Sequence, residues 1–85
     1  MPARPFILQA SEADRLRAVN CLTQAVYYEA GYEPPEGRRA VAQVVINRMR
    51  HAGYPKSICG VVYQGSGRAT GCQFSFTCDG SLGRP

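Results

Sequence analysis

The spacing of apolar residues predicts a helix at the start of the chain. From Glu12 to about Ala30, apolar positions recur every three or four residues, as they do along one face of an α-helix. Ser11 offers an N-cap, with Asp14 three residues further on. Gly31 is expected to end the helix in a left-handed conformation. The expected inner face comprises Leu16, Val19, Leu22, Thr23, Val26 and Ala30.

A second helix is expected from about Pro35 to Arg50. Pro35 suits the first helical position, and Glu36 complements the positive end of the helix dipole. Gly53 and the following Tyr54-Pro55 mark its end. The expected inner face is Ala40, Val41, Val44, Val45 and Met49, and the expected polar side is Arg38, Arg39, Asn47, Arg48 and Arg50.

Shorter elements are predicted beyond residue 55. Ser57 is a suitable cap for a short helix that contains Ile58, Val61 and Val62. Residues 72–76 are expected to form a short strand or extended segment, because two phenylalanines alternate there with polar residues. Residues 1–10 are expected to form an N-terminal arm, since Pro2 and Pro5 disfavour a helix. The expected fold class is α+β, mainly helical, with one small domain over residues 11–85.

The four cysteines change this picture, because 85 residues bury only a thin core. An even number of cysteines in a short chain is compatible with two disulfides, for which three pairings exist. Two disulfides would compensate for the thin core and would indicate an oxidising compartment. Buried thiols, or a metal site that includes His51, are the alternatives, although no C-x-x-C pair is present. The cysteines are Cys21, Cys59, Cys72 and Cys78.

The charge balance favours an anionic partner. Ten Lys and Arg residues outnumber six Asp and Glu residues, for a net charge of +4. Nucleic acid, anionic lipid and anionic cell-wall polymer all meet this condition. No apolar run approaches the roughly 20 residues that a membrane-spanning helix needs. The N-terminal residues also lack the apolar stretch of a signal peptide.

Glu29 is the first candidate for chemistry. It lies in the last turn of the first predicted helix among three tyrosines, which predict partial shielding of its carboxyl group from water, as general-acid catalysis requires. The alternative is an ordinary solvated carboxylate. Glu33 is a second candidate or a support for the next helix. Asp79 is a third, either as a base or as a turn former. A polar and aromatic set suited to sugar binding comprises Tyr63, Gln64, Gln73 and Ser75.

Four ordered blocks of sequence, together covering about residues 20–82, resemble the cell-wall hydrolase family typified by the spore cortex-lytic enzyme SleB. The blocks are Cys21–Ala30, Gly37–Arg48, Tyr54–Gln64 and Gly71–Gly80. The resemblance implies a fold related to lysozymes and lytic transglycosylases. It also implies cleavage of the β-1,4 bond between N-acetylmuramic acid and N-acetylglucosamine. The family usually reads Glu-Ala-Arg-Gly-Glu where this chain has residues 29–33 as Glu-Ala-Gly-Tyr-Glu. The family domain also normally continues beyond the part present here.

The family's catalytic glutamate falls on Glu29, which the resemblance implies to act first as acid and then as base. No cofactor or metal is expected. The expected partners are peptidoglycan glycan strands, with no nucleic acid, for a monomer in the periplasm, cell envelope or extracellular space. A catalytically incomplete peptidoglycan-binding module is the alternative function. Our hypothesis for the disulfides is Cys21–Cys59 and Cys72–Cys78, the second closing a short local loop. The expected substrate-binding residues are Tyr28, Glu33, Tyr63, Gln64, Gln73, Phe74 and Ser75.

Overall fold

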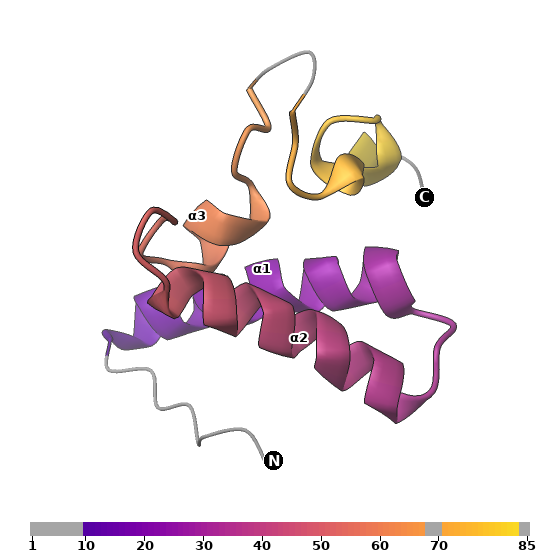
Figure 1. The fold of residues 1–85 in the computed structure, drawn as a ribbon, viewed down its shortest axis with the longest axis horizontal. Coiled ribbons are helices and arrows are strands. Elements are labelled where there is room, and N and C mark those ends of the chain that lie inside the picture. The colour runs from indigo at the N-terminus through magenta and orange to yellow at the C-terminus, as the bar shows by residue number, and fades with distance from the viewer. Residues whose placement is uncertain (1–9, 68–70, 84–85) are drawn as a thin grey trace.

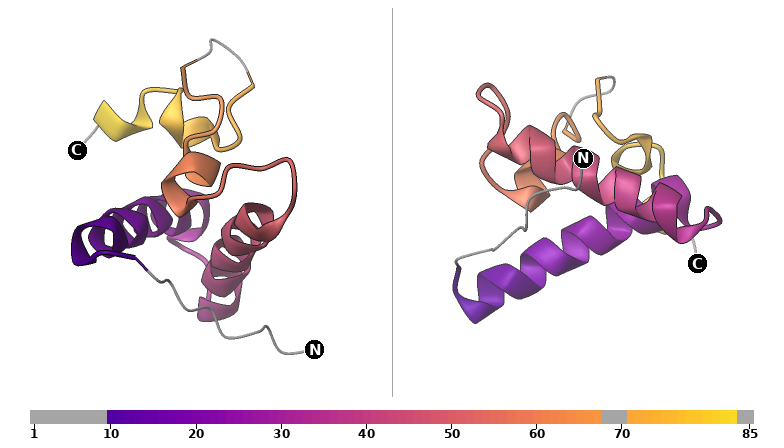
Figure 2. Two further views of the ribbon diagram at one scale, coloured as in Figure 1. Left: turned by 90° about the vertical axis from the view of Figure 1, so that its left-hand side faces the viewer. Right: turned by 60° about the horizontal axis from the view of Figure 1, so that its bottom comes forward.

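The computed structural model describes residues 10–67 and 71–83, and within them the chain is mainly helical. Helices α1 and α2 lie side by side, α3 sits across the pair, and the C-terminal segment (residues 71–83) folds back over the end of α1 (Figures 1 and 2). No strand occurs among the described residues, and the expected mainly helical fold is confirmed. The helices are α1 (Glu12–Ala30), α2 (Pro35–Arg50) and α3 (Ile58–Val62), followed by 3₁₀ helices at Ser75–Thr77 and Ser81–Gly83.

The predicted N-terminal arm falls on residues 1–9, outside the described part of the chain, apart from Ala10. None of the described helices is long and apolar enough to cross a membrane.

The predicted helix starts are confirmed by their caps. The Ser11 hydroxyl accepts a hydrogen bond from the Asp14 backbone N–H at 3.2 Å, and the Ser57 hydroxyl accepts one from Gly60 at 2.9 Å. Each bond satisfies one of the backbone donors that the first turn of a helix leaves unpaired. The bounds of α1 and α2 also agree with the predicted ones, because caps and breakers are local signals.

The prediction for Gly31 is wrong in its physical reason. Gly31 follows α1 with φ −60°, a right-handed conformation that any residue can adopt. A Cβ atom at this position would lie 2.5 Å from the Tyr27 carbonyl oxygen. Glycine is therefore required here by a close approach of the backbone. Gly53, after α2, does have the positive φ of 94° that favours glycine.

The core lies between the three helices and the C-terminal segment. Val45, Val61 and Val62 are fully buried. The C-terminal segment contributes two aromatic rings to the same cluster, so it closes the core and is not a loose tail. The buried cluster comprises Ala18, Ala25, Val45, Ile58, Val61, Val62, Phe74 and Phe76.

The expected inner face of α1 is only partly correct: Ala30 is buried and Leu22 packs against the core, but two of the large apolar residues are exposed. Leu16 and Val19 are 61% and 59% exposed, whereas Ala18 and Ala25, seven residues apart, are buried. Small side chains on this face let the neighbouring helices approach closely, and Cys21 on the same side bonds to α3. The inner face of α2 is only partly as predicted. Val45 is buried, and Val41 and Met49 pack against the core, but Ala40 and Val44 are exposed.

Both hypothesised disulfides are present. Cys21–Cys59 joins α1 to α3, and Cys72–Cys78 closes a loop within the C-terminal segment. No described cysteine is free, so neither buried thiols nor cysteine ligands for a metal remain.

The strand expected over residues 72–76 is replaced by a turn of 3₁₀ helix. Phe74 has extended backbone angles, but Ser75–Thr77 is helical, and no neighbouring strand is present among the described residues to pair with. The alternation of the side chains is nevertheless correct. Phe74 and Phe76 are 7% and 2% exposed, whereas Gln73 and Ser75 are exposed.

Val45 and Val44 provide a test of this core. Val45→Ala is expected to lower the free energy of unfolding by about 2 kcal/mol, because it removes two buried methyl groups and leaves a cavity. Val44→Ala, on the neighbouring exposed position, is expected to cost about 0.5 kcal/mol or less. Urea unfolding of both variants measures the difference. Equal losses would contradict the described orientation of α2.

Candidate active site

Glu29 lies on the core-facing side of α1, one turn before the helix ends. It follows the buried Ala25 by four residues and Ala18 by eleven, which places the three on the same face of a helix with 3.6 residues per turn. At this end of α1 the core no longer covers that face. Glu29 is exposed, and within the described residues its side chain makes no hydrogen bond or ion pair. Its carboxyl group is therefore open to a ligand.

The expected partial shielding of Glu29 by its neighbouring tyrosines is not seen, because Glu29 itself is exposed. Tyr27 and Tyr32 are also 67% and 107% exposed. Only Tyr28 packs against another part of the chain. Water would have to be excluded from Glu29 by a bound ligand.

Tyr28 connects the end of α1 to the C-terminal segment. Its ring stacks on Phe76, with centroids 4.7 Å apart and planes 11° from parallel. Its hydroxyl group donates a hydrogen bond to the Ser81 carbonyl oxygen at 3.5 Å. Phe76 is almost fully buried, so this stack fixes the C-terminal segment against Tyr28, the residue directly before Glu29.

Tyr63 reaches the same phenylalanine from the end of α3. Its ring meets Phe76 edge-on at 6.3 Å, and its hydroxyl group donates a hydrogen bond to the Gln24 side-chain oxygen on α1. Phe76 is therefore held between an aromatic residue of α1 and one that follows α3. Tyr63 is itself partly buried, so only part of it is available to a ligand.

Gln73 is exposed and is anchored to α2 and to the segment that follows α3. Its side-chain oxygen accepts a hydrogen bond from Arg48 Nη1 at 2.9 Å, and its backbone N–H donates to the Gln64 carbonyl oxygen at 3.0 Å. The Arg48 guanidinium also lies 5.8 Å from the Phe74 ring centroid and 6.0 Å from that of Tyr54. These contacts hold the loop closed by Cys72–Cys78 against the end of α2.

Phe76 contacts three of the predicted binding residues, Tyr28, Tyr63 and Phe74. Gln64 and Gln73 are joined to each other by a backbone hydrogen bond. Gln73 and Ser75 are exposed, but the Phe74 ring is buried and has no surface with which to contact a sugar. The Gln64 side-chain oxygen is buried and has no hydrogen-bond partner in the described part of the chain. Phe74 is therefore positioned to support the site, whereas Gln64, which is half-buried, stays a predicted binding residue.

Glu33 does not belong to this group. Its side chain lies over Gly37 in the first turn of α2, where a Cβ atom on the glycine would come within 2.9 Å of Glu33 Cβ. Asp79 has the role of a turn former, because its Oδ1 accepts hydrogen bonds from the backbone N–H and the hydroxyl group of Ser81. Neither carboxylate is presented as an obvious second catalytic group.

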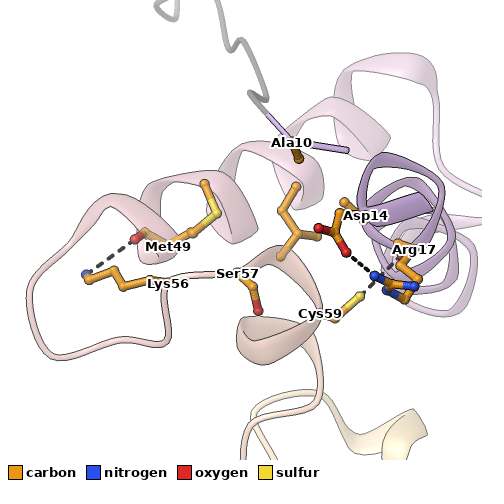
Figure 3. Close-up of a pocket in the computed structure, with 9 residues that line it drawn as sticks. Ala10, Asp14, Arg17, Met49, Lys56, Ser57 and Cys59 are labelled. Atoms are coloured by element: carbon orange, nitrogen blue, oxygen red, sulfur yellow. Dashed lines mark hydrogen bonds and ion pairs between the residues drawn. The ribbon is translucent and has the colours of Figure 1, made fainter. Parts of the chain in front are cut away.

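A cavity of about 430 Å³ lies at the opposite end of α1 from Glu29 (Figure 3). Its charged groups are already engaged. Arg17 pairs with Asp14, and Lys56 donates hydrogen bonds to the Met49 and His51 carbonyl oxygens at the end of α2. A second hollow, of about 340 Å³, lies between α1 and the start of α2 and is lined partly by Tyr27 and Gly31. Neither is lined by Glu29, which is exposed.

Sequence reasoning missed three residues of the site: Gln24, Arg48 and Phe76. The sequence pattern places Arg48 on the polar side of α2. Its position three residues after Val45 nevertheless brings it near the core-facing side, a signal that could have identified it. The alternation of residues 72–76 puts Phe76 on the same side as Phe74, but its contacts with Tyr28 and Tyr63 depend on the fold.

The chain is thus small and mainly helical, with two disulfides. Its exposed glutamate, Glu29, directly follows Tyr28, whose contacts hold the C-terminal segment in place. A family model described as Cell Wall Hydrolase matches residues 32–85, and the chain belongs to this family. The match begins three residues after Glu29, so it covers the C-terminal segment but not the glutamate.

Curated relatives with the same name in three organisms match over 46 residues, 54% of this chain. The chain is 44% identical to the spore cortex-lytic enzyme of Bacillus subtilis strain 168, 41% to that of Oceanobacillus iheyensis and 39% to that of Halalkalibacterium halodurans. The matched part is 15%, 17% and 14% of these relatives, respectively, so the chain corresponds to less than a fifth of their length. No solved structure matches the chain.

Proposed function

We propose that this chain contributes the catalytic carboxyl group of a peptidoglycan-cleaving enzyme and that this group is Glu29. Membership of the cell wall hydrolase family is the observation that carries the proposal. The names of the matched relatives, spore cortex-lytic enzymes, agree with a cell-wall substrate. The open position of Glu29 beside an ordered polar and aromatic surface supports the choice of residue.

The bond that we propose to be cleaved is the β-1,4 bond between N-acetylmuramic acid and N-acetylglucosamine. The Glu29 carboxyl group donates its proton to the glycosidic oxygen as the bond from that oxygen to muramyl C1 breaks. The resulting carboxylate then accepts the proton of the muramyl C6 hydroxyl group as that oxygen bonds to C1. The products are a 1,6-anhydromuramyl end and a free N-acetylglucosamine hydroxyl group, and Glu29 is protonated again.

This lytic transglycosylase mechanism agrees with a site that has one exposed glutamate. The nucleophile belongs to the substrate, and the intramolecular attack replaces an activated water. A second carboxylate is not needed, which fits the engagement of Asp79 in a turn. An exposed carboxyl group also suits a long polymer that cannot enter a closed cavity.

The chemistry of the chain supports a location in the periplasm, the cell envelope or the extracellular space. Two disulfides persist in oxidising compartments, and a net charge of +4 favours approach to anionic cell-wall polymer. We expect the protein to act as a monomer, with glycan strands as its partners.

A peptidoglycan-binding module without catalysis is the second candidate, and the exposure of Glu29 is the observation that favours it. The two candidates are separated by incubation of the purified chain with cell-wall sacculi, followed by mass analysis of the soluble fragments. Anhydromuropeptides would support the transglycosylase reaction, and reducing ends would indicate hydrolysis. Sedimentation of the chain with sacculi and no release of fragments would support the binding module. No binding and no release would contradict both.

A further inference from the structure

We infer that Gln73 is a specificity residue that recognises the N-acetyl carbonyl oxygen of an amino sugar, and that Arg48 is the residue that positions it. The inference rests on the proposed function, because it assigns one contact of the same glycan. It adds a ligand group for Gln73 and a role for Arg48.

The orientation of the Gln73 amide follows from the chemistry of its partner. An arginine side chain carries only hydrogen-bond donors, so the atom that Gln73 turns toward Arg48 Nη1 must be its oxygen. The amide nitrogen of Gln73 is therefore directed away from that contact. Among the described residues, none accepts a hydrogen bond from it. Gln73 is exposed, so this nitrogen is a donor available to a ligand.

Arg48 is itself held in place, which makes the orientation of the amide durable. Its guanidinium lies within the range of a cation–π contact with the rings of both Phe74 and Tyr54. The Gln73 backbone is fixed separately by its bond to the Gln64 carbonyl oxygen and by the neighbouring Cys72–Cys78 disulfide. The Gln73 side chain is thus fixed at its amide oxygen and at its backbone. Its amide N–H donor therefore gives up little conformational freedom when it binds a ligand.

An amide oxygen is the acceptor that suits such a donor in peptidoglycan. Both sugars of the glycan strand carry an N-acetyl group, whose carbonyl oxygen is a stronger acceptor than the surrounding hydroxyl groups. Phe76 links the two regions of the surface, because it stacks on Tyr28 next to Glu29 and follows Gln73 by three residues. Gln73 thus suits a sugar bound away from the cleaved bond.

The test compares the affinity of the chain for the tetrasaccharide of N-acetylglucosamine and for its de-N-acetylated form. The wild-type chain is expected to prefer the acetylated form by roughly tenfold, the value of one good hydrogen bond. Gln73→Met has a similar length but no donor, and it should lose most of this preference. Gln73→Glu, which keeps a partner for Arg48 but presents only acceptors, should lose it as well. Arg48→Gln, which no longer fixes the amide, should reduce the preference by a smaller factor.

Gln43→Met is the matched control, because Gln43 lies on α2 and its amide donates to Asn47. It should retain the full preference, and thermal unfolding of every variant should confirm that the fold is intact. The inference is overturned if the wild-type chain shows no preference, or if Gln73→Met and Gln73→Glu both keep it. A wild-type chain that binds neither tetrasaccharide nor sacculi would refute the proposed function as well, so the two failures are distinguishable.

Discussion

Glu29→Gln is expected to lower the rate at which the chain releases soluble fragments from sacculi by at least about a hundredfold, because a positioned general acid and base contributes about 10²–10⁴-fold. The amide has the size of the carboxyl group but cannot transfer a proton to the glycosidic oxygen. Folding should be unaffected, since the Glu29 side chain has no hydrogen-bond or ion-pair partner among the described residues. The loss of turbidity of a sacculus suspension measures the rate.

Glu12→Gln is the matched control for this experiment. Glu12 is exposed and lies in the first turn of the same helix, at the end far from Glu29. It should retain the wild-type rate, and both variants should sediment with sacculi as the wild-type chain does. A Glu29→Gln variant that keeps more than about a third of the wild-type rate would show that another group is the proton donor.

Removal of the Cys21–Cys59 disulfide is expected to have the largest effect on stability. The bond joins residues 38 apart in sequence, so its absence in a Cys21→Ala/Cys59→Ala variant releases a long loop in the unfolded chain. The expected loss is about 4 kcal/mol in the free energy of unfolding. A domain of this size has little stability in reserve, so the variant should be substantially unfolded near 37 °C. Circular dichroism during thermal and urea unfolding measures the loss.

The Cys72→Ala/Cys78→Ala variant supplies the comparison. Its disulfide joins residues only six apart, for which the same relation gives about 2 kcal/mol. This variant should remain folded but bind glycan more weakly, because the loop that carries Gln73 is no longer closed. If the 72–78 bond proved the more important for stability, the described role of Cys21–Cys59 as the link between α1 and α3 would be wrong.

The helices could be predicted from sequence because their signals are local. Ser11 and Ser57 cap the helices that follow them, and Pro35 begins α2 as expected. Each signal acts within one turn of the backbone and does not depend on the rest of the fold. The hypothesised disulfide pairing is also confirmed, although two other pairings were formally possible.

The buried face of α1 could be predicted only in part, because it depends on how closely the neighbouring helices pack against it. Leu16 and Val19 have the correct spacing for a buried stripe, yet the helix packs through Ala18 and Ala25. Helices that approach closely leave room only for small side chains at their contact. The periodicity of apolar residues does not reveal how close that approach is. The expected shielding of Glu29 failed for a related reason. Neighbouring tyrosines in sequence do not cover a carboxyl group unless the fold turns their rings toward it.

We propose that the Glu29 carboxyl group faces the bond to be cleaved, and a structure of the chain with bound glycan would show whether it does. The Glu29→Gln variant can be crystallised with a peptidoglycan tetrasaccharide that it does not degrade. We expect the side-chain amide that replaces the carboxyl group to lie within about 3.2 Å of the glycosidic oxygen between N-acetylmuramic acid and N-acetylglucosamine. A glycan bound in the cavity of Figure 3, or anywhere that leaves residue 29 without contact, would contradict it.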